Sequence, residues 1–142
     1  MVEVGVFQGK NAEHILQLNQ RVKLILVDSW KPYPDMSQNW VRAKGITYSR
    51  FRGNRRVKII EKKSVEAAID VLDQSVDLVF LDAAHDYNSV CNDIHAWLPK
   101  IKVGGWIGGH DYGDPRWKVH LAVQEFFASY DLSTDLTWWV KC

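Results

Sequence analysis

Two carboxylates in the sequence stand directly after apolar segments, where chemistry is often placed. Asp82 follows Leu78–Leu81, and Asp111 comes two residues after Trp106–Gly109. Four consecutive apolar residues are too short for a helix and too uniformly apolar for a half-exposed strand, so Leu78–Leu81 predicts a strand that is covered on both faces. Ligands of open α/β sheets bind at the carboxyl ends of the strands. We therefore expect Asp82 and Asp111 to meet at one functional edge of a sheet.

A divalent cation could lie between Asp82 and Asp111, because neighbouring strands are only ~4.8 Å apart. Mg²⁺ typically takes one or two carboxylates together with waters and substrate oxygens. His110 could be a third ligand, although imidazole suits Zn²⁺, Mn²⁺ or Fe²⁺ better than Mg²⁺. The alternative is structural: Asp82 caps the turn before the next helix, and His110 only hydrogen-bonds its own turn.

His85 lies three residues after Asp82, in the same expected turn. Histidine can act as a general base on a substrate hydroxyl, since its ordinary pKa of about 6.5 is close to neutral pH. Packing of His85 and Tyr87 under the loop is the structural alternative.

A glycine segment, Glu3-Val4-Gly5-Val6-Phe7-Gln8-Gly9, joins the first expected strand to a helix. Glycine allows a sharp turn and lets a ligand approach the backbone closely. The dinucleotide-binding pattern G-x-G-x-x-G requires a second glycine where this chain has Phe7, so a pyrophosphate would meet a side chain there. A plain tight turn is the alternative interpretation.

Asp28 ends the second apolar segment, where an acid can accept hydrogen bonds from both ribose hydroxyls. An acid at this position, without a pyrophosphate loop, indicates an adenosine cofactor that lacks phosphates. S-adenosylmethionine is such a cofactor. The alternative is that Asp28 caps a helix or a turn.

The elements that must position these residues alternate along the chain. We expect strands over residues 2–7, 23–28, 57–61, 78–81, 106–109 and 136–140. We expect helices over residues 11–18, 36–51, 65–72, 88–98 and 115–130, with Gly45 interrupting the second and Ser64 capping the third. This order predicts an α/β fold: a Rossmann-like, doubly wound, mostly parallel sheet with helices on both faces. Residues 1–142 are enough for a single domain.

Three smaller features carry structural predictions. Lys102–Gly105 predicts a turn before the fifth strand. The adjacent Trp138 and Trp139 must face opposite sides of a strand, so one of them should enter the core. Asp93 is expected at a solvated position of its helix.

Composition excludes several classes of protein. With 18 basic and 17 acidic residues, the net charge is +1, which provides no electrostatic footprint for nucleic acid. No apolar segment approaches the ~18 residues of a membrane-spanning helix, and no signal peptide precedes the first strand. Cys91 and Cys142 do not form a disulfide framework. We therefore expect a reduced, cytoplasmic protein that binds neither nucleic acid nor membrane.

Four segments together resemble a known family: residues 2–9 (VEVGVFQG), 26–30 (LVDSW), 79–87 (VFLDAAHDY) and 103–112 (VGGWIGGHDY). They resemble the class I S-adenosylmethionine-dependent methyltransferases, and within these the methyltransferase domain 24 family. That family is related to macrocin-type and catechol-type O-methyltransferases and to cephalosporin hydroxylase. The resemblance covers nearly the whole chain.

The resemblance implies a role for each matching residue. His85 stands where catechol-type enzymes carry their catalytic lysine, and His110 stands at the place of a third, usually acidic, metal ligand. Asp82 is implied in cofactor binding, metal binding and catalysis, and Asp111 in metal binding. The remaining implied cofactor-binding residues are Glu3, Gly5, Phe7, Gly9 and Asn11 in and after the first motif, Asp28 and Trp30 after the second strand, and Ser64 beside the adenine.

The resemblance also implies an activity, the transfer of a methyl group from S-adenosylmethionine to a hydroxyl of a small molecule, such as a sugar or polyol. A divalent metal (Mg, Mn or Fe) could assist. Two alternatives stay open: a non-catalytic or partner-dependent cofactor-binding subunit, and an oxygenase of the cephalosporin hydroxylase type.

The ends of the chain differ from those of the full fold. The N-terminal helices of relatives are absent, so the cleft is open, is covered by another subunit of a homo-oligomer, or is incomplete because the chain is a fragment. At the C-terminus we expect a shortened antiparallel pair, with Asp131–Thr134 as the candidate for its first strand.

Overall fold

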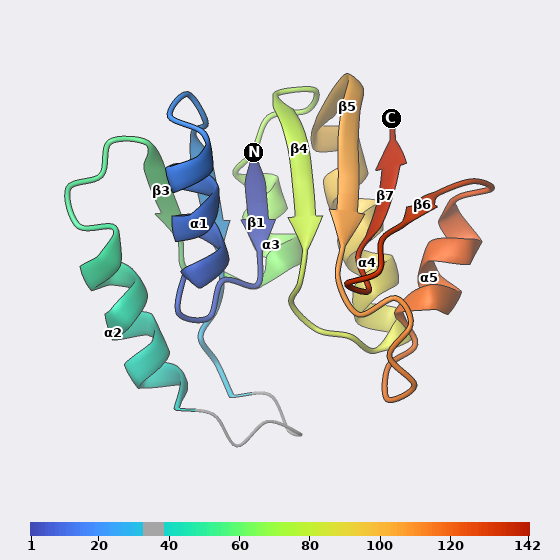
Figure 1. Ribbon diagram of the computed structural model, residues 1–142, viewed down its shortest axis with the longest axis horizontal. Helices are drawn as coiled ribbons and strands as arrows, with labels where there is room; N and C mark the ends of the chain where they lie inside the picture. Colours follow the sequence, from blue (N-terminus) through green and yellow to red (C-terminus); the bar gives the residue numbers. More distant parts are fainter. Residues whose placement is uncertain (33–38) are drawn as a thin grey trace.

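Figure 1 shows the computed structural model, which describes residues 1–32 and 39–142. The described part of the chain forms one sheet in the strand order β3-β2-β1-β4-β5-β7-β6. The first five strands are parallel, whereas β7 runs antiparallel to both β5 and β6. The strands are β1 (Val2–Val4), β2 (Leu24–Val27), β3 (Val57–Ile60), β4 (Val76–Leu81), β5 (Ile101–Gly109), β6 (Asp131–Leu132) and β7 (Trp138–Lys141). The predicted Rossmann-like fold is confirmed, and its antiparallel pair is closed by the two-residue strand β6.

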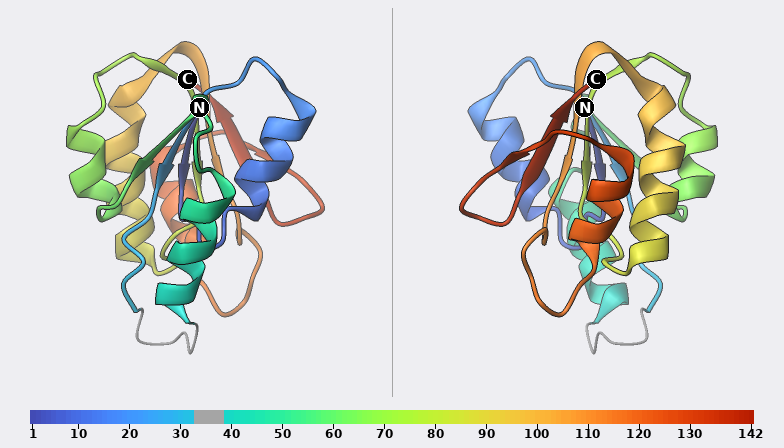
Figure 2. Two further views of the ribbon diagram at one scale, coloured as in Figure 1. Left: turned by 90° about the vertical axis from the view of Figure 1, so that its left-hand side faces the viewer. Right: turned by 90° about the vertical axis from the view of Figure 1, so that its right-hand side faces the viewer.

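Helices cover both faces of this sheet. Figure 2 shows it nearly edge-on, with α1 on one side and α3, α4 and α5 on the other. The helices are α1 (Lys10–Leu18), α2 (Trp40–Arg50), α3 (Ser64–Ile69), α4 (Tyr87–Trp97) and α5 (Val119–Phe126), with a short 3₁₀ turn η1 (Leu98–Lys100) after α4. Among the described residues, no helix has both the length and the apolar character that crossing a bilayer requires.

The core is divided by the sheet into two clusters. Side chains alternate along a strand, so β2 sends Leu24 and Leu26 into the cluster under α1 and α2, and Val27 into the cluster under α3, α4 and α5. Fully burying one such side chain contributes about 1.5–3 kcal/mol. Covering on both faces explains why these strands read as continuous apolar segments.

The tandem tryptophans of β7 confirm the prediction that they face opposite ways. Trp138 is 1% exposed within the larger cluster, whereas Trp139 stacks on Phe80 with ring centroids 5.6 Å apart. In the β5–β7 pairing, Gly108 lies opposite Trp139 and Gly109 opposite Trp138. A Cβ on Gly108 would lie 2.3 Å from the Trp139 ring, so these glycines make room for the two indoles.

The turn predicted over Lys102–Gly105 is instead an irregular part of a longer strand β5. Ile101 pairs with Val76 and Trp106 pairs with Leu78, so four residues of β5 lie opposite one residue of β4. Such a bulge interrupts the ladder without ending the strand. The prediction that β5 begins at residue 106 was therefore wrong.

Three helix boundaries also differ from the predictions. Ser64 is the first residue of α3 rather than its cap, and Lys63 precedes it without a side-chain cap. The last helix is shorter than predicted: α5 covers Val119–Phe126, and Phe127 is already extended. The second helix begins at Trp40 and continues through Gly45. Asn39 caps it, because its side chain accepts a hydrogen bond from a backbone N–H. Residues 36–38 of that predicted helix lie outside the described residues.

The carboxyl ends of β1 to β5 point to one edge of the sheet, which is the lower edge in Figure 1, and both termini lie at the opposite edge. The loops that follow these strands therefore gather the residues to which the sequence assigns chemistry.

Candidate functional site

Asp28 holds the loop that follows β1. Its Oδ2 accepts hydrogen bonds from the backbone N–H of Val6 (3.0 Å) and Phe7 (2.8 Å), and its Oδ1 accepts one from the N–H of Trp30 (2.7 Å). A carboxylate offers about four lone-pair sites, so three of them are used by the backbone. Asp28 thus ties the end of β2 to the first loop, and still lies on a cavity wall.

Phe7 is the centre of that loop. Its φ of 49° is in the left-handed region, which is rare for a bulky residue. The Phe7 carbonyl accepts hydrogen bonds from Trp30 Nε1 (2.8 Å) and Thr47 Oγ1 (2.7 Å), and its ring meets Trp40 edge-on with centroids 5.6 Å apart. Contacts from Trp30, in the loop after β2, and from α2 thus hold the strained residue in place.

The two motif glycines are required by packing of the chain on itself. At Gly5 the φ is 91°, and a Cβ would lie 2.0 Å from the backbone oxygen of Asp82. At Gly9 the φ is 71°, and a Cβ would lie 2.6 Å from the ring of Phe51. The first glycine therefore lets the loops after β1 and β4 approach each other, and the second lets α1 begin against α2.

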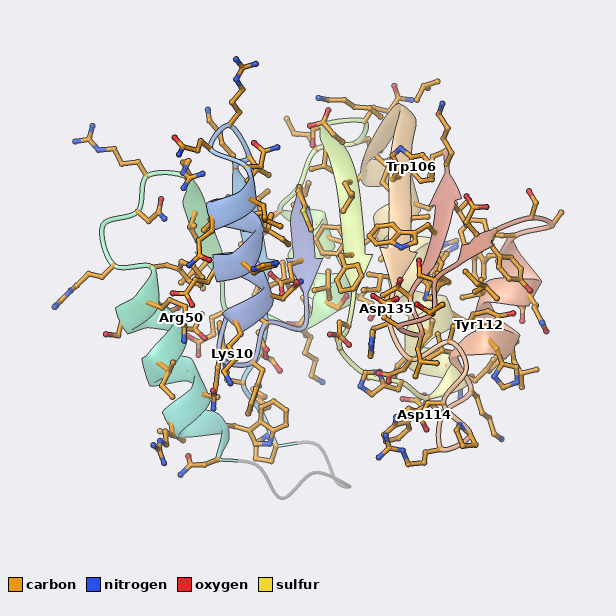
Figure 3. The ribbon with its side chains drawn as sticks, in the orientation of Figure 1. Lys10, Arg50, Trp106, Tyr112, Asp114 and Asp135 are labelled. Atoms are coloured by element: carbon orange, nitrogen blue, oxygen red, sulfur yellow. The ribbon has the colours of Figure 1, made fainter. Side chains whose placement is uncertain are left out.

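Arg50 adds a further tie from α2 to the start of α1 (Figure 3). Its Nε donates to the backbone oxygen of Gln8 (3.1 Å), and its guanidinium forms an ion pair with Glu13. The glycine loop is therefore held in place by Arg50 as well as by Asp28.

Glu3 lies behind the loop and is 2% exposed. Its Oε1 accepts a hydrogen bond from Asn11 Nδ2 (3.2 Å), while Oε2 is buried without a hydrogen-bond partner among the described residues. Burial raises the pKa of Glu3 to about 8. The hydrogen bond from Asn11 opposes this shift, and the neighbouring charges of Asp82 and Asp28 add to it.

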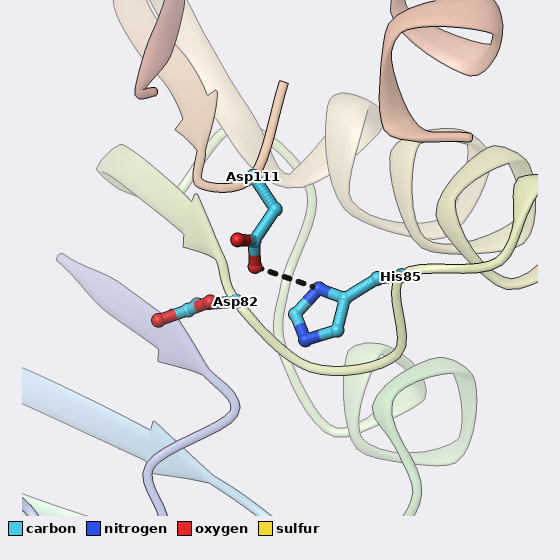
Figure 4. A group of neighbouring side chains, drawn as sticks. All are labelled: Asp82, His85 and Asp111. Carbon is cyan, nitrogen blue, oxygen red and sulfur yellow. Dashed lines mark ion pairs between the residues drawn. The ribbon is translucent and has the colours of Figure 1, made fainter. Parts of the chain in front are cut away.

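Asp82, His85 and Asp111 form a cluster at the ends of β4 and β5 (Figure 4). One ligand atom from each lies within 4.8 Å of the others, and His85 Nδ1 is 3.2 Å from Asp111 Oδ2. Asp111 has a φ of 61°, which aims its side chain from the loop after β5 toward β4. The sequence-based expectation that the two carboxylates converge is met.

Burial controls the charges of this cluster. It raises the pKa of Asp82 to about 7. The charge of His110 opposes this shift, whereas the charge of Asp111 adds to it. Burial also lowers the pKa of the His85 imidazole, although the Asp111 carboxylate opposes this shift. At neutral pH His85 is therefore mainly uncharged and able to accept a proton.

The third member of the cluster differs from the sequence-based hypothesis. His110 was expected beside the two carboxylates, but among the described residues His85 completes the grouping. His110 Nδ1 lies 3.2 Å from the other oxygen of Asp111, and its side chain is 37% exposed. It contacts Asp111 next to the cluster, and its role as a metal ligand stays a prediction.

A cavity of about 890 Å³ connects the glycine loop, Asp28 and the Asp82–His85 end. Five of the predicted cofactor-binding residues line it: Gly5, Phe7, Asp28, Ser64 and Asp82. The four others are not among its lining residues: Glu3, Gly9, Asn11 and Trp30. Of these, Trp30 supports the loop through its indole N–H.

Trp117 and Asp93 are among the lining residues that the sequence reasoning missed. Trp117 packs against His85, with ring centroids 5.1 Å apart. Asp93, expected to be solvated, is 6% exposed. Its spacing from Val90 and Trp97 places it on the buried face of α4. That spacing was the available signal, and it was overlooked because a charged side chain is usually exposed.

The fold and the cavity define a Rossmann-like α/β domain with a ligand site at the carboxyl ends of its strands. A family model described as a methyltransferase domain matches residues 2–112. The chain therefore belongs to this methyltransferase family, which confirms the resemblance found in the sequence.

An uncharacterized protein of Acanthamoeba polyphaga mimivirus is 31% identical over 125 residues, which are 84% of this chain and 54% of that protein. The chain thus spans about half the length of this relative.

Solved structures share the fold at low identity. A TDP-rhamnose 3'-O-methyltransferase of calicheamicin biosynthesis aligns with a TM-score of 0.71 and 13% identity, covering 99% of this chain and 71% of that one. An rRNA methylase from Streptococcus thermophilus aligns with a TM-score of 0.65 and 15% identity, covering 99% of this chain and 82% of that one. These two proteins are named for very different acceptors, so the fold alone leaves the acceptor open.

Proposed function

We propose that this chain binds S-adenosylmethionine in the cavity and transfers its methyl group to a hydroxyl oxygen of a small molecule, such as a sugar or polyol. The observation that carries the proposal is that one cavity joins Asp28, the candidate ribose ligand, to Asp82 and His85. Its volume of about 890 Å³ lies within the range of small-molecule sites.

The reaction balances with groups that the chain supplies. The acceptor oxygen attacks the methyl carbon in line, a C–O bond forms, and the C–S bond breaks with its electron pair going to sulfur. The products are a methyl ether and S-adenosylhomocysteine. The hydroxyl proton passes to His85, and most of the acceleration comes from positioning the two reactants.

Asp111 orients the proposed base. Asp111 Oδ2 lies 3.2 Å from His85 Nδ1, so the carboxylate charge favours a proton on that nitrogen and a lone pair on Nε2. Packing of Trp117 on the imidazole restricts its rotation. These two contacts favour one tautomer and one orientation of His85.

Asp82 and Asp111 also suit a divalent cation, with His85 left to take the proton. They supply two carboxylates within 4.8 Å of each other, and the carboxyl of Asp82, kept partly protonated by burial, would ionise more readily beside a cation. When bound, such a cation lowers the pKa of a coordinated hydroxyl and orients it.

Two further features support a small acceptor rather than a nucleic acid. Phe7, Trp40 and Trp117 lie on the cavity wall, and their aromatic rings are suitable surfaces for the apolar face of a sugar ring or for a flat molecule. The net charge of +1 lacks the basic excess that binding of RNA usually needs. The structural neighbour named for TDP-rhamnose is consistent with a sugar hydroxyl.

Calorimetry with S-adenosylhomocysteine tests the cofactor assignment. We expect the wild-type chain to bind it and Asp28→Ala to bind at least about tenfold more weakly, because the loop and the ribose lose their shared acceptor. Asp73→Ala, which changes an exposed carboxylate whose partner is Lys100, is the matched control. Equal affinity of Asp28→Ala and wild type would contradict the nucleoside assignment.

Measurement of turnover tests the proposed methyl transfer to a hydroxyl. Incubation with S-adenosylmethionine and a panel of sugars and polyols, followed by mass spectrometry, should show a product heavier by one methylene. Binding of the cofactor product without methylation of any hydroxyl compound would favour a non-catalytic or partner-dependent subunit instead.

A further inference from the structure

Asp93 is a buried acid on the cavity wall that the proposed reaction does not use. It lies on α4 and is 6% exposed, yet it lines the cavity together with Ser64, the first residue of α3. The two side chains are hydrogen-bonded to each other. They form the wall where α3 and α4 meet.

A chain of hydrogen bonds sets the direction of the Ser64 hydroxyl. The indole Nε1 of Trp97 donates to Ser64 Oγ at 2.9 Å. Because Trp97 can only donate, the Ser64 hydroxyl is left to donate its own proton to the Asp93 carboxylate. Asp93 thus receives one side-chain hydrogen bond from within the fold.

The Asp93 carboxylate still has acceptor sites to fill. Burial raises its pKa to about 6, the Ser64 hydrogen bond opposes the shift, and the nearby charge of Asp86 adds to it. No cationic side chain contributes to this balance among the described residues. A buried carboxylate with unused lone pairs is stabilised by a ligand that donates hydrogen bonds.

The strand order indicates which part of the ligand reaches this wall. Asp82 follows β4, the glycine loop follows β1, Asp28 follows β2 and Ser64 follows β3, in the spatial order β4-β1-β2-β3. A cofactor with its sulfonium near Asp82 and its ribose at Asp28 therefore directs its base toward the α3–α4 wall. This step rests on the proposed function.

We propose that Asp93 recognises the adenine of the cofactor by accepting a hydrogen bond from its 6-amino group, with Ser64 fixing the carboxylate. An amino group at this position donates, whereas the 6-keto oxygen of a hypoxanthine base presents lone pairs that the carboxylate repels. Asp93 is thus a specificity-determining residue for an amino-purine cofactor.

Binding of S-adenosylhomocysteine and of its deaminated analogue, S-inosylhomocysteine, tests the proposal by calorimetry. Wild type should prefer the amino form by at least about tenfold, since a hydrogen bond to a charged group is worth about 1.5–3 kcal/mol. In Asp93→Asn the new amide can donate to the keto oxygen, so the preference should fall by at least about tenfold. Asp73→Asn, a change at an exposed acid, should retain the wild-type preference.

The outcomes separate this inference from the function on which it rests. If wild type binds both ligands equally, or if Asp93→Asn keeps the full preference, the role of Asp93 is wrong while the cofactor assignment stands. If wild type binds neither ligand, the proposed function fails together with the inference. The wild-type comparison requires no variant, so poor folding of Asp93→Asn would not prevent a decision.

Discussion

Two neighbours and its burial prepare His85 for proton transfer. Asp111 contacts its Nδ1 at 3.2 Å, Trp117 packs against its ring, and burial lowers the pKa of the imidazole. The two contacts restrict the ring, and burial favours its neutral form, although the Asp111 charge opposes that shift. Sequence reasoning identified the residue from its place after Asp82, but Asp111 and Trp117 come from the segment that follows β5, beyond the whole of α4.

Replacement of His85 tests its assignment as the base. We expect His85→Gln to lower kcat by about 10²–10⁴-fold, the usual contribution of a general base, with little change in affinity for S-adenosylhomocysteine. Initial rates and calorimetry measure the two effects. His14→Gln, an exposed position on α1, is the control. A variant with full turnover would exclude His85 as the base.

Glu3 links the site to stability through its raised pKa. A carboxyl whose pKa is higher in the folded state than its ordinary value binds its proton more tightly when folded, so stability falls as pH rises between the two values. For Glu3 this window extends from the ordinary glutamate pKa of about 4.3 to about 8.

Glu3→Gln should remove this dependence. We expect the free energy of unfolding of wild type to fall relative to the variant as pH rises from about 5 to 7.5, by up to about 1.4 kcal/mol per pH unit. Urea denaturation at several pH values measures the difference. Glu66→Gln, at an exposed position of α3, serves as the control. Parallel stability profiles for wild type and Glu3→Gln would show that Glu3 is ionised in the folded protein throughout this range.

At the scale of elements, the pairing of β5 with β7 matches two glycines to two tryptophans. Trp138 and Trp139 close the two faces of the sheet at its antiparallel end, and this is possible because Gly108 and Gly109 have no side chains. Neighbouring glycines in a strand normally weaken it, but the opposed indoles cover their backbone here.

Two glycine-to-alanine changes should have opposite effects on stability. Gly108→Ala would place a Cβ 2.3 Å from the Trp139 ring, so we expect a loss of about 1–3 kcal/mol. Gly45→Ala, at a helical position with nothing within 4 Å, should gain about 0.5–1 kcal/mol. Chemical denaturation of both variants measures these changes. A neutral Gly108→Ala would mean that β7 can shift away from β5.

The whole molecule brings the two candidate metal ligands together from separate loops. Asp82 follows β4 and Asp111 follows β5, so a cation between them would join two neighbouring strand ends. Ligands that bind only the folded state stabilise it, by about 2.7 kcal/mol at a hundredfold excess over Kd.

Divalent cations should therefore raise the melting temperature. We expect Mg²⁺ or Mn²⁺ to raise the Tm of wild type, a chelator to reverse the gain, and Asp82→Asn to abolish it. Thermal unfolding with each ion, with elemental analysis of the purified protein, makes the measurement. An unchanged Tm in wild type together with a metal-free protein would remove the metal from the proposal.

Much of the fold and part of the site were accessible to sequence reasoning. The order of strands and helices followed from apolar segments and turn residues, because parallel strands must be buried on both faces. Asp28, Asp82 and Asp111 were found because each terminates such a strand or follows it closely. The boundaries of α5 and β5 were not predicted correctly, since a local pattern does not show where tertiary packing ends a helix or introduces a bulge into a strand.

The sequence by itself determined that parallel strands would bring their terminal acids to one edge, since this follows from alternating elements and right-handed crossovers. Only the tertiary structure decided which side chains complete the site there. It grouped His85 rather than His110 with the two carboxylates, buried Asp93 in the cavity wall, and assigned the motif glycines to packing against Asp82 and Phe51. These outcomes depend on loop paths and on contacts between residues far apart in the chain, which local spacing does not encode.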